Sequence, residues 1–318
     1  MLCILYVNII GTCLGIAGFL VERVLPATSP RRWVWVLVIA ITMTVPGIYQ
    51  ANHTASVIDA LEHQAVGNVF GATSLSVFDP EWWASTASYS DVITRGWLTA
   101  SALLIIWGVA NALRVSLLLR RSRMQHEKAE NIASVDGVPV LVTDSLGPAT
   151  VGLWRSRVLI PQWVLALPGV QRRYVLRHED EHRKAHDARL LMLASLTLIL
   201  TPWNLALWWQ LRRLRLAVEM DCDNRVVSAL GNAREYGALL LRVAEATSRG
   251  PRLQPALLGG MGSLERRLRL LLAPEPLKHI QRLLLPAIAC VLLFIVLSMP
   301  HPVLRSHAHA STTSNSTK

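Results

Sequence analysis

Much of this 318-residue chain is free of charge in long, continuous stretches. Four segments contain no Asp, Glu, Lys or Arg, and each is about as long as, or longer than, the roughly 20 residues that a helix needs to cross a bilayer. A fifth, Gly96–Leu113, is extended by apolar residues up to Leu119. We therefore expect an α-helical integral membrane protein. The four segments are Met1–Val21, Trp33–Ile58 (apolar only as far as about Tyr49), Leu190–Leu211 and Leu283–Leu304.

Arginine residues between these segments predict their orientation. Arg23, Arg31 and Arg32 separate the first two segments, and four more arginines follow the fifth. The region of about residues 50–94 contains five acidic residues and no Lys or Arg. Because Lys and Arg favour the cytoplasmic side of a membrane, we expect this loop and both termini to lie outside. The stretch of residues 121–281 is then cytoplasmic.

The same reasoning divides the chain into regions. Residues 1–120 are expected to form three membrane spans, residues 282–304 a final span, and residues 305–318 a short disordered tail outside. The net charge of +11 could indicate nucleic acid binding. The basic residues crowd the flanks of the predicted spans, however, and no nucleic-acid motif accompanies them, so we expect no direct contact with nucleic acid.

The stretch RHEDEHRKAHD contains a pattern typical of zinc hydrolases. His178 and His182 are four residues apart, so on a helix they share one face and are separated by about 6 Å along the axis. Glu179 stands beside the first histidine and can take a proton from a water molecule that a metal activates. The pattern also occurs by chance in charged helices, so a solvated helix face is the alternative interpretation.

A second pair of acidic residues favours the metal site. Glu219 and Asp223 are again one helical turn apart, and hydrolytic zinc needs a third protein ligand. Glu219 would bind the metal, and Asp223 would accept the free ring N–H of a ligating histidine. Cys222 is close enough in sequence for a metal role, but we expect a small buried thiol.

Other polar residues near this pattern leave alternatives open. His186 lies one turn beyond His182, but a row of three rings along a helix axis is too long to reach one ion, so we do not expect it to be a ligand. The residue that stabilises the transition-state oxyanion is not identified by the sequence. Tyr236, His186, Asn204 and nearby arginines are all candidates.

Short strands are predicted before the histidine-rich helix. GVPVLVTDS reads as one strand, and GPATVGLWRSRVLIPQ as two strands split near Trp154–Ser156. Helices are predicted at Trp163–Leu167 and Gln171–Lys184. Ala149–Leu153 is the candidate edge strand that would hold an extended substrate, although an ordinary structural hairpin is equally compatible with the spacing.

These motifs together resemble the BlaR/MecR antirepressor family of membrane zinc metallopeptidases. The resemblance covers roughly residues 100–240 and includes LRHEDEH, Asp187 five residues after the second histidine, TPWNLALWW and RLAVEMDCD. It implies a cytoplasmic α+β zincin-like metallopeptidase domain embedded in a helical protein of the bacterial inner membrane. Carried over by position, His178, His182 and Glu219 would bind Zn²⁺, Glu179 would be the general base, and Asp223 would support a ligating histidine.

The resemblance also implies a substrate. By this resemblance, we expect the chain to cut a cytosolic transcriptional repressor, such as a winged-helix protein, after an external signal. The chain after Pro300 is a short polar tail, whereas β-lactam-sensing members continue there into a penicillin-binding domain. Two alternatives remain: a membrane quality-control protease resembling HtpX or the CAAX prenyl proteases, and a non-enzymatic membrane receptor or scaffold.

A shared zinc ion constrains the segment Leu190–Leu211. The two histidines precede it and Glu219 follows it, so a single crossing would place them on opposite sides of a hydrocarbon layer about 30 Å thick. The sequence Thr201-Pro202-Trp203-Asn204 interrupts the run near its middle. We therefore predict a helical hairpin associated with the cytoplasmic face, with Trp203, Trp208 and Trp209 near the interface.

Overall fold

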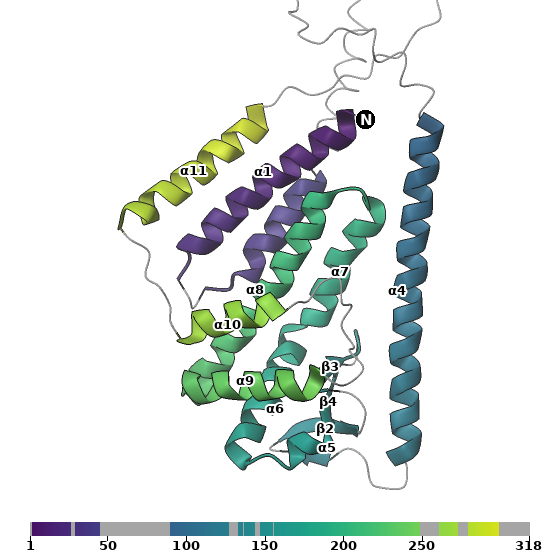
Figure 1. Ribbon diagram of the computed structural model, residues 1–318, viewed down its shortest axis with the longest axis vertical. Coiled ribbons are helices and arrows are strands. Elements are labelled where there is room, and N and C mark those ends of the chain that lie inside the picture. The colour runs from purple at the N-terminus through teal and green to yellow at the C-terminus, as the bar shows by residue number, and fades with distance from the viewer. Residues whose placement is uncertain are drawn as a thin grey trace, which may run out of the picture.

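The computed structural model is built mainly of helices, with one small sheet (Figure 1). It describes residues 2–26, 29–44, 90–126, 133–135, 137–143, 147–154, 156–248, 261–272 and 279–298. A helix at Arg32–Thr44 accompanies the labelled elements. The labelled elements are α1 (Leu2–Val24), α4 (Ser90–His126), β1 (Ala133–Val135), β2 (Val138–Thr143), β3 (Ala149–Val151), β4 (Arg157–Pro161), α5 (Gln162–Leu165), α6 (Gly169–Ala185), α7 (Asp187–Leu200), α8 (Leu205–Leu230), α9 (Ala233–Ser248), α10 (Met261–Leu272) and α11 (His279–Ser298).

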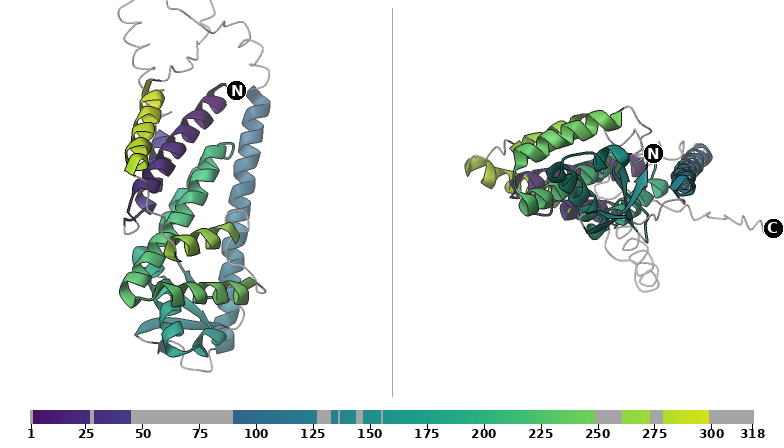
Figure 2. Two further views of the ribbon diagram at one scale, coloured as in Figure 1. Left: turned by 60° about the vertical axis from the view of Figure 1, so that its left-hand side comes forward. Right: turned by 90° about the horizontal axis from the view of Figure 1, so that it is seen from below.

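The elements occupy two regions along the longest axis of the molecule. Helices α1, α7 and α11 and the first half of α8 lie toward the marked N-terminus, whereas the sheet, α5, α6 and α9 lie at the opposite end (Figures 1 and 2). Helix α8 connects the regions, because it packs against both α1 and α6. Helix α4 runs beside α7, where Trp97 Nε1 donates a hydrogen bond to the Leu200 carbonyl over 2.9 Å.

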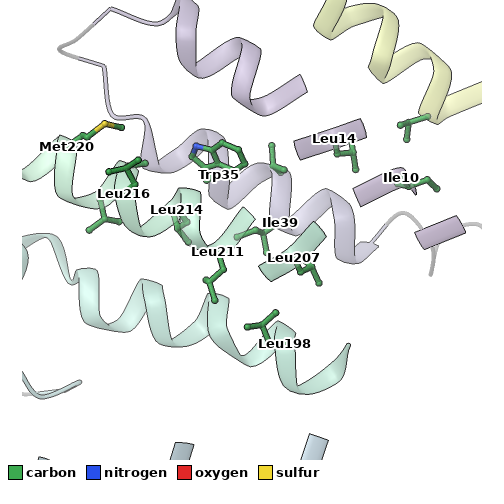
Figure 3. Packing of buried hydrophobic residues seen from close by; sticks show 14 residues of the cluster. Ile10, Leu14, Trp35, Ile39, Leu198, Leu207, Leu211, Leu214, Leu216 and Met220 are labelled. Carbon is green, nitrogen blue, oxygen red and sulfur yellow. The ribbon is translucent and has the colours of Figure 1, made fainter. Parts of the chain in front are cut away.

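A core of apolar side chains joins the helices of the first region. Trp35 of the Arg32–Thr44 helix is fully buried and meets the ring of Trp209 of α8 edge to face, with centroids 5.6 Å apart. Gly15 of α1 makes this approach possible, since a Cβ there would lie 2.3 Å from Trp209 Cζ3. The side chains drawn in Figure 3 include Ile10, Leu14, Ile39, Leu198, Leu207, Leu211, Leu214, Leu216 and Met220.

Two described helices are long and apolar enough to cross a membrane, Ile4–Val24 and Asp91–Leu117. The most apolar part of the second contains no buried residue, so it is not the core helix of a soluble protein. Shorter apolar helices occur at Arg32–Thr44 and Ile280–Val296. These four helices overlap the predicted spans, and each begins or ends one to five residues outside them. The orientation across a bilayer stays a prediction. Of the predicted outside loop, the structure describes only residues 90–94, which form the start of α4. The tail at 305–318 also lies outside the described residues.

The chain reverses at Thr201–Asn204, where the sequence predicts a break in the apolar segment. Helix α7 ends at Leu200 and α8 begins at Leu205, and the two helices pack against each other. Asn204 caps α8 because its side-chain oxygen accepts a hydrogen bond from the Leu207 amide over 3.2 Å. The placement of this hairpin relative to a bilayer remains a prediction. Trp209, which is predicted near the membrane interface, packs against Trp35 in the core of the helix bundle.

The sheet places a short edge strand beside the histidine-rich helix. Its order is β1-β2-β4-β3, with β2 and β4 parallel and the other pairs antiparallel. Val158, Leu159 and Ile160 of β4 are fully buried, as expected for an interior strand. The predicted edge segment forms a strand only at Ala149–Val151, and this strand packs against α6.

Candidate metal centre

Helix α6 brings the two motif histidines together. It runs from Gly169 to Ala185, two residues before and one residue beyond the predicted bounds, and it places His178 Nε2 3.2 Å from His182 Nε2. His186 is the C-cap that follows the last residue of the helix, and it adopts a left-handed conformation with φ 55°. Because His186 is exposed and the chain changes direction there, it does not extend the row of rings.

Helix α8 adds the predicted third ligand. One Glu219 carboxylate oxygen lies 3.7 Å from His178 Nε2, and the other lies 3.8 Å from His182 Nε2. Ligand atoms bonded to one tetrahedral Zn²⁺ at about 2.0–2.1 Å are roughly 3.3 Å from one another. The three donor groups therefore face a common point, and a small contraction brings all three within reach of one ion.

The hydrogen bonds at the two Nδ1 atoms leave the Nε2 atoms of both rings facing each other. Asp187 accepts from His182 Nδ1, with Oδ2 2.8 Å away. The Tyr236 hydroxyl lies 2.9 Å from His178 Nδ1 and donates to Asp223 Oδ1 over 2.7 Å, so it accepts the ring N–H. Each ring then carries its proton on Nδ1, an assignment made from these partners. The two Nε2 atoms are within hydrogen-bond distance at 3.2 Å, so without a metal they share one proton, and a bound cation would take the place of that proton.

Asp223 reaches His178 differently from the prediction. Its nearest oxygen is 3.6 Å from His178 Nδ1, so the direct bond is replaced by a path through the Tyr236 hydroxyl. Tyr236 is 1% exposed and engaged in these two bonds, so it is not available as the oxyanion donor that the sequence analysis considered. Asn204 is also excluded from that role, because it starts α8 and lies about 22 Å of helix before Glu219.

Arg267 of α10 is a site residue that sequence reasoning missed. Its guanidinium makes two bonds of 2.7 Å to the Asp223 carboxylate and a contact of 2.9 Å to Glu219 Oε2. These carboxylates raise the pKa of Arg267 well above its usual value, despite the opposing effect of burial. The only signal in the sequence is the basic run LERRLRL, which does not indicate which arginine faces the site.

Cys222 offers a competing donor. Its sulfur is close enough to His178 and His182 for the three residues to form a possible metal-binding group. The sulfur lies 3.3 Å from His178 Nδ1 and an equal distance from the His178 carbonyl. The sulfur is also hydrogen-bonded to His182, so it reaches both rings. At His178, however, it lies by the ring nitrogen that Tyr236 contacts, whereas Glu219 lies by Nε2. Burial raises the pKa of the Cys222 thiol to about 11, which disfavours the thiolate that a metal needs. The geometry favours Glu219.

Glu179 is buried beside the two histidine rings and is hydrogen-bonded to the edge strand β3. It is 8% exposed, and burial raises its pKa to about 7. The hydroxyl of Thr150 in β3 lies 2.6 Å from the Glu179 carbonyl oxygen and 3.2 Å from its carboxylate Oε2. The edge strand and the predicted base therefore hold a fixed relative position.

A polar chain connects the metal centre to the start of the Arg32–Thr44 helix. Asp221 accepts hydrogen bonds from the backbone amides of Arg31 and Arg32 over 2.9 and 3.1 Å, so it caps that helix. Arg32 also donates to Asp187 Oδ1 over 2.6 Å, and Asp187 holds His182. The turn between the first two apolar helices therefore contacts the carboxylate that orients His182.

Comparison with known proteins gives the family. A search among curated proteins finds no match. The family model described as BlaR1 peptidase M56 matches residues 2–271, and this range includes the first apolar helix, the histidine-rich helix, Glu219 and Arg267. The match extends well beyond the segment that carries the sequence motifs. The chain therefore belongs to the BlaR1 peptidase M56 family.

Proposed function

We propose that this chain is a membrane-bound zinc endopeptidase with His178, His182 and Glu219 as its metal ligands. The family is one of peptidases, and the observation that carries the assignment is the convergence of two imidazole Nε2 atoms and one carboxylate. The packing of α6 against both α8 and a small sheet supports a zincin-like domain. Zinc would polarise the scissile carbonyl and lower the pKa of a water molecule toward about 7.

The residues around this centre have distinct tasks. Glu179 acts as the general base, because a carboxyl group with a pKa of about 7 can accept a proton from water and return it to the leaving amine. Asp187 orients His182, while Asp223 orients His178 through Tyr236. Arg267 anchors one oxygen of Glu219 and leaves the other directed toward His182.

The edge strand β3 is proposed to bind the substrate. Among the described strands it pairs only with β4, so its other edge has free backbone groups. An extended peptide can add to such an edge through main-chain hydrogen bonds. Thr150 then couples the position of the peptide to Glu179, because its hydroxyl contacts that residue from the same strand.

The biological substrate we propose is a cytosolic transcriptional repressor of the winged-helix type, cleaved in response to an external signal. Family membership supports this proposal, and the arginine-rich turns favour a site on the cytoplasmic side of the bacterial inner membrane. The protease would act on the repressor rather than on nucleic acid. A dimer is compatible with this role.

Substitution of Glu179 by Ala tests the catalytic assignment. The Glu179→Ala protein should bind zinc at the wild-type ratio, measured by mass spectrometry, but should cleave no protein substrate. Glu219→Ala should lose both zinc and cleavage, and Glu245→Ala, at an exposed position of α9, serves as the control with the same chemical change. If the wild-type protein binds zinc but, like the variants, cleaves no substrate, the result would support the scaffold alternative.

Comparison of protein termini in cells identifies the substrate. Cells that produce wild-type protein should contain new termini within a repressor that are missing from cells with Glu179→Ala. Cleavage spread over many misfolded membrane proteins would instead support the quality-control alternative.

A further inference from the structure

A basic cavity lies where α1 ends and α11 begins. Its volume is about 980 Å³, and its other walls come from α8 and α10. Seven arginines and only three carboxylates line it, so the lining has an excess of four positive charges. It lies apart from the two Nε2 atoms of the metal centre, although Arg267 and Asp223 contribute to its wall.

The three carboxylates of the lining are already neutralised. Glu22 pairs with Arg213, Asp223 with Arg267, and Glu265 with Arg269. Four arginines of the lining have no carboxylate partner within the described parts of the chain. These are Arg23, Arg31, Arg266 and Arg282.

Two of the arginine side chains are buried with incomplete hydrogen bonding. Arg31 is 8% exposed, and within the described residues its guanidinium contacts only the Met220 sulfur, 3.9 Å away. The Nε atoms of Arg31 and Arg213 have no hydrogen-bond acceptor. Burial and the neighbouring Arg213 lower the pKa of Arg266, a further sign of crowded positive charge. Arg213 has Glu22 as its anion, but the Arg31 guanidinium is buried without one, which is unfavourable. An anion in the cavity would neutralise it.

The surroundings of the cavity indicate which anion fits. Ile280, Leu283 and Leu284 of α11 flank Gln281 and Arg282 of the lining, and their side chains are 63%, 64% and 52% exposed. A ligand with a phosphate group and apolar chains would satisfy both surfaces, with the phosphate held by arginine guanidinium groups and the chains along α11. Basic pockets between membrane helices on the cytoplasmic side bind anionic headgroups in this manner.

We propose that this cavity binds the headgroup of an anionic phospholipid from the cytoplasmic leaflet. The proposal rests on the membrane placement given above, but not on zinc binding or peptidase activity. Helix α10 supplies Arg266 to the cavity and Arg267 to the metal centre, so a bound lipid would also restrain the helix that anchors Glu219.

Native mass spectrometry of the full-length protein in detergent tests the proposal. The probes are phosphatidylglycerol, phosphatidylcholine with the same acyl chains, and inorganic phosphate. We expect phosphatidylglycerol to bind at least tenfold more tightly than phosphatidylcholine, and Arg266→Gln/Arg282→Gln to reduce its affinity at least tenfold. The control Arg114→Gln/Arg120→Gln removes two exposed arginines from α4 on the same predicted side and should change affinity less than twofold.

Several results would overturn the proposal. Equal affinity for the two lipids, or equal losses in both double variants, would indicate non-specific association with detergent-exposed surface. Displacement of the lipid by inorganic phosphate at equal concentration would assign the cavity to a soluble anion. If the double variant does not fold, the single Arg282→Gln change of an exposed side chain carries the test, with a loss of at least threefold expected. Unchanged zinc content and cleavage in a variant that loses lipid would leave the proposed enzyme function intact.

Discussion

Asp187 is the residue through which the metal centre meets the turn between the first two apolar helices. Its side chain is 3% exposed, with one oxygen 2.8 Å from His182 Nδ1 and the other 2.6 Å from Arg32. In Asp187→Asn, an NH2 group replaces one carboxylate oxygen and cannot accept a hydrogen bond, so one of the two bonds is lost. Loss of such an orienting carboxylate weakens metal binding by about 10–100-fold, or roughly 1.4–2.7 kcal/mol.

Competition with a chromophoric zinc chelator measures this loss at a temperature where both proteins are folded. Arg32→Ala should produce a smaller loss, because it leaves the bond between Asp187 and His182 in place. Asp180→Asn is the matched control, since Asp180 pairs with Arg183 and Lys184 and contacts neither ring. Zinc affinity of Asp187→Asn within twofold of wild type would refute the orienting role, as would an equal loss in Asp180→Asn.

Three further predictions concern a competing ligand, helix packing and pH. Cys222→Ala should keep stoichiometric zinc, and the cobalt-substituted wild-type protein should show no thiolate-to-cobalt charge-transfer band; loss of metal in this variant would assign the sulfur as a ligand. Gly15→Ala should destabilise the protein by about 1–3 kcal/mol because its Cβ would overlap Trp209, whereas Gly108→Ala, with no atom within 4 Å, should be neutral in thermal unfolding. Burial raises the folded-state pKa of Glu179 from 4.5 to about 7, so metal-free wild-type protein loses stability as pH rises between these values. Relative to wild type, Glu179→Gln should therefore gain about 3 kcal/mol in unfolding free energy between pH 4 and pH 8 in chemical denaturation, and a pH-independent difference would contradict the buried position.

Local spacing explains which parts of the site could be predicted. His178 and His182, like Glu219 and Asp223, are placed by the helical repeat alone, and the break at Thr201–Asn204 follows from proline and asparagine chemistry. These features depend on neighbours in sequence, so a single chain is sufficient to predict them.

Contacts between distant segments explain what could not be predicted. Arg267 reaches Asp223 across 44 residues, and the backbone of Arg31 reaches Asp221 across 190. The run around Arg267 offers several equivalent arginines, so its pattern does not show which one enters the site. The packing of α9 against α6 is not visible in the sequence, so the sequence does not show that Tyr236 is engaged with His178 and Asp223.

Anomalous diffraction at the zinc absorption edge, from crystals of the zinc-loaded protein, tests the ligand set directly. We expect one peak within about 2.2 Å of His178 Nε2, His182 Nε2 and an oxygen of Glu219. Asp187 should retain its bond to His182, and Arg267 should still contact Asp223. A peak bonded to the Cys222 sulfur, or no peak between the two rings at saturating zinc, would contradict it.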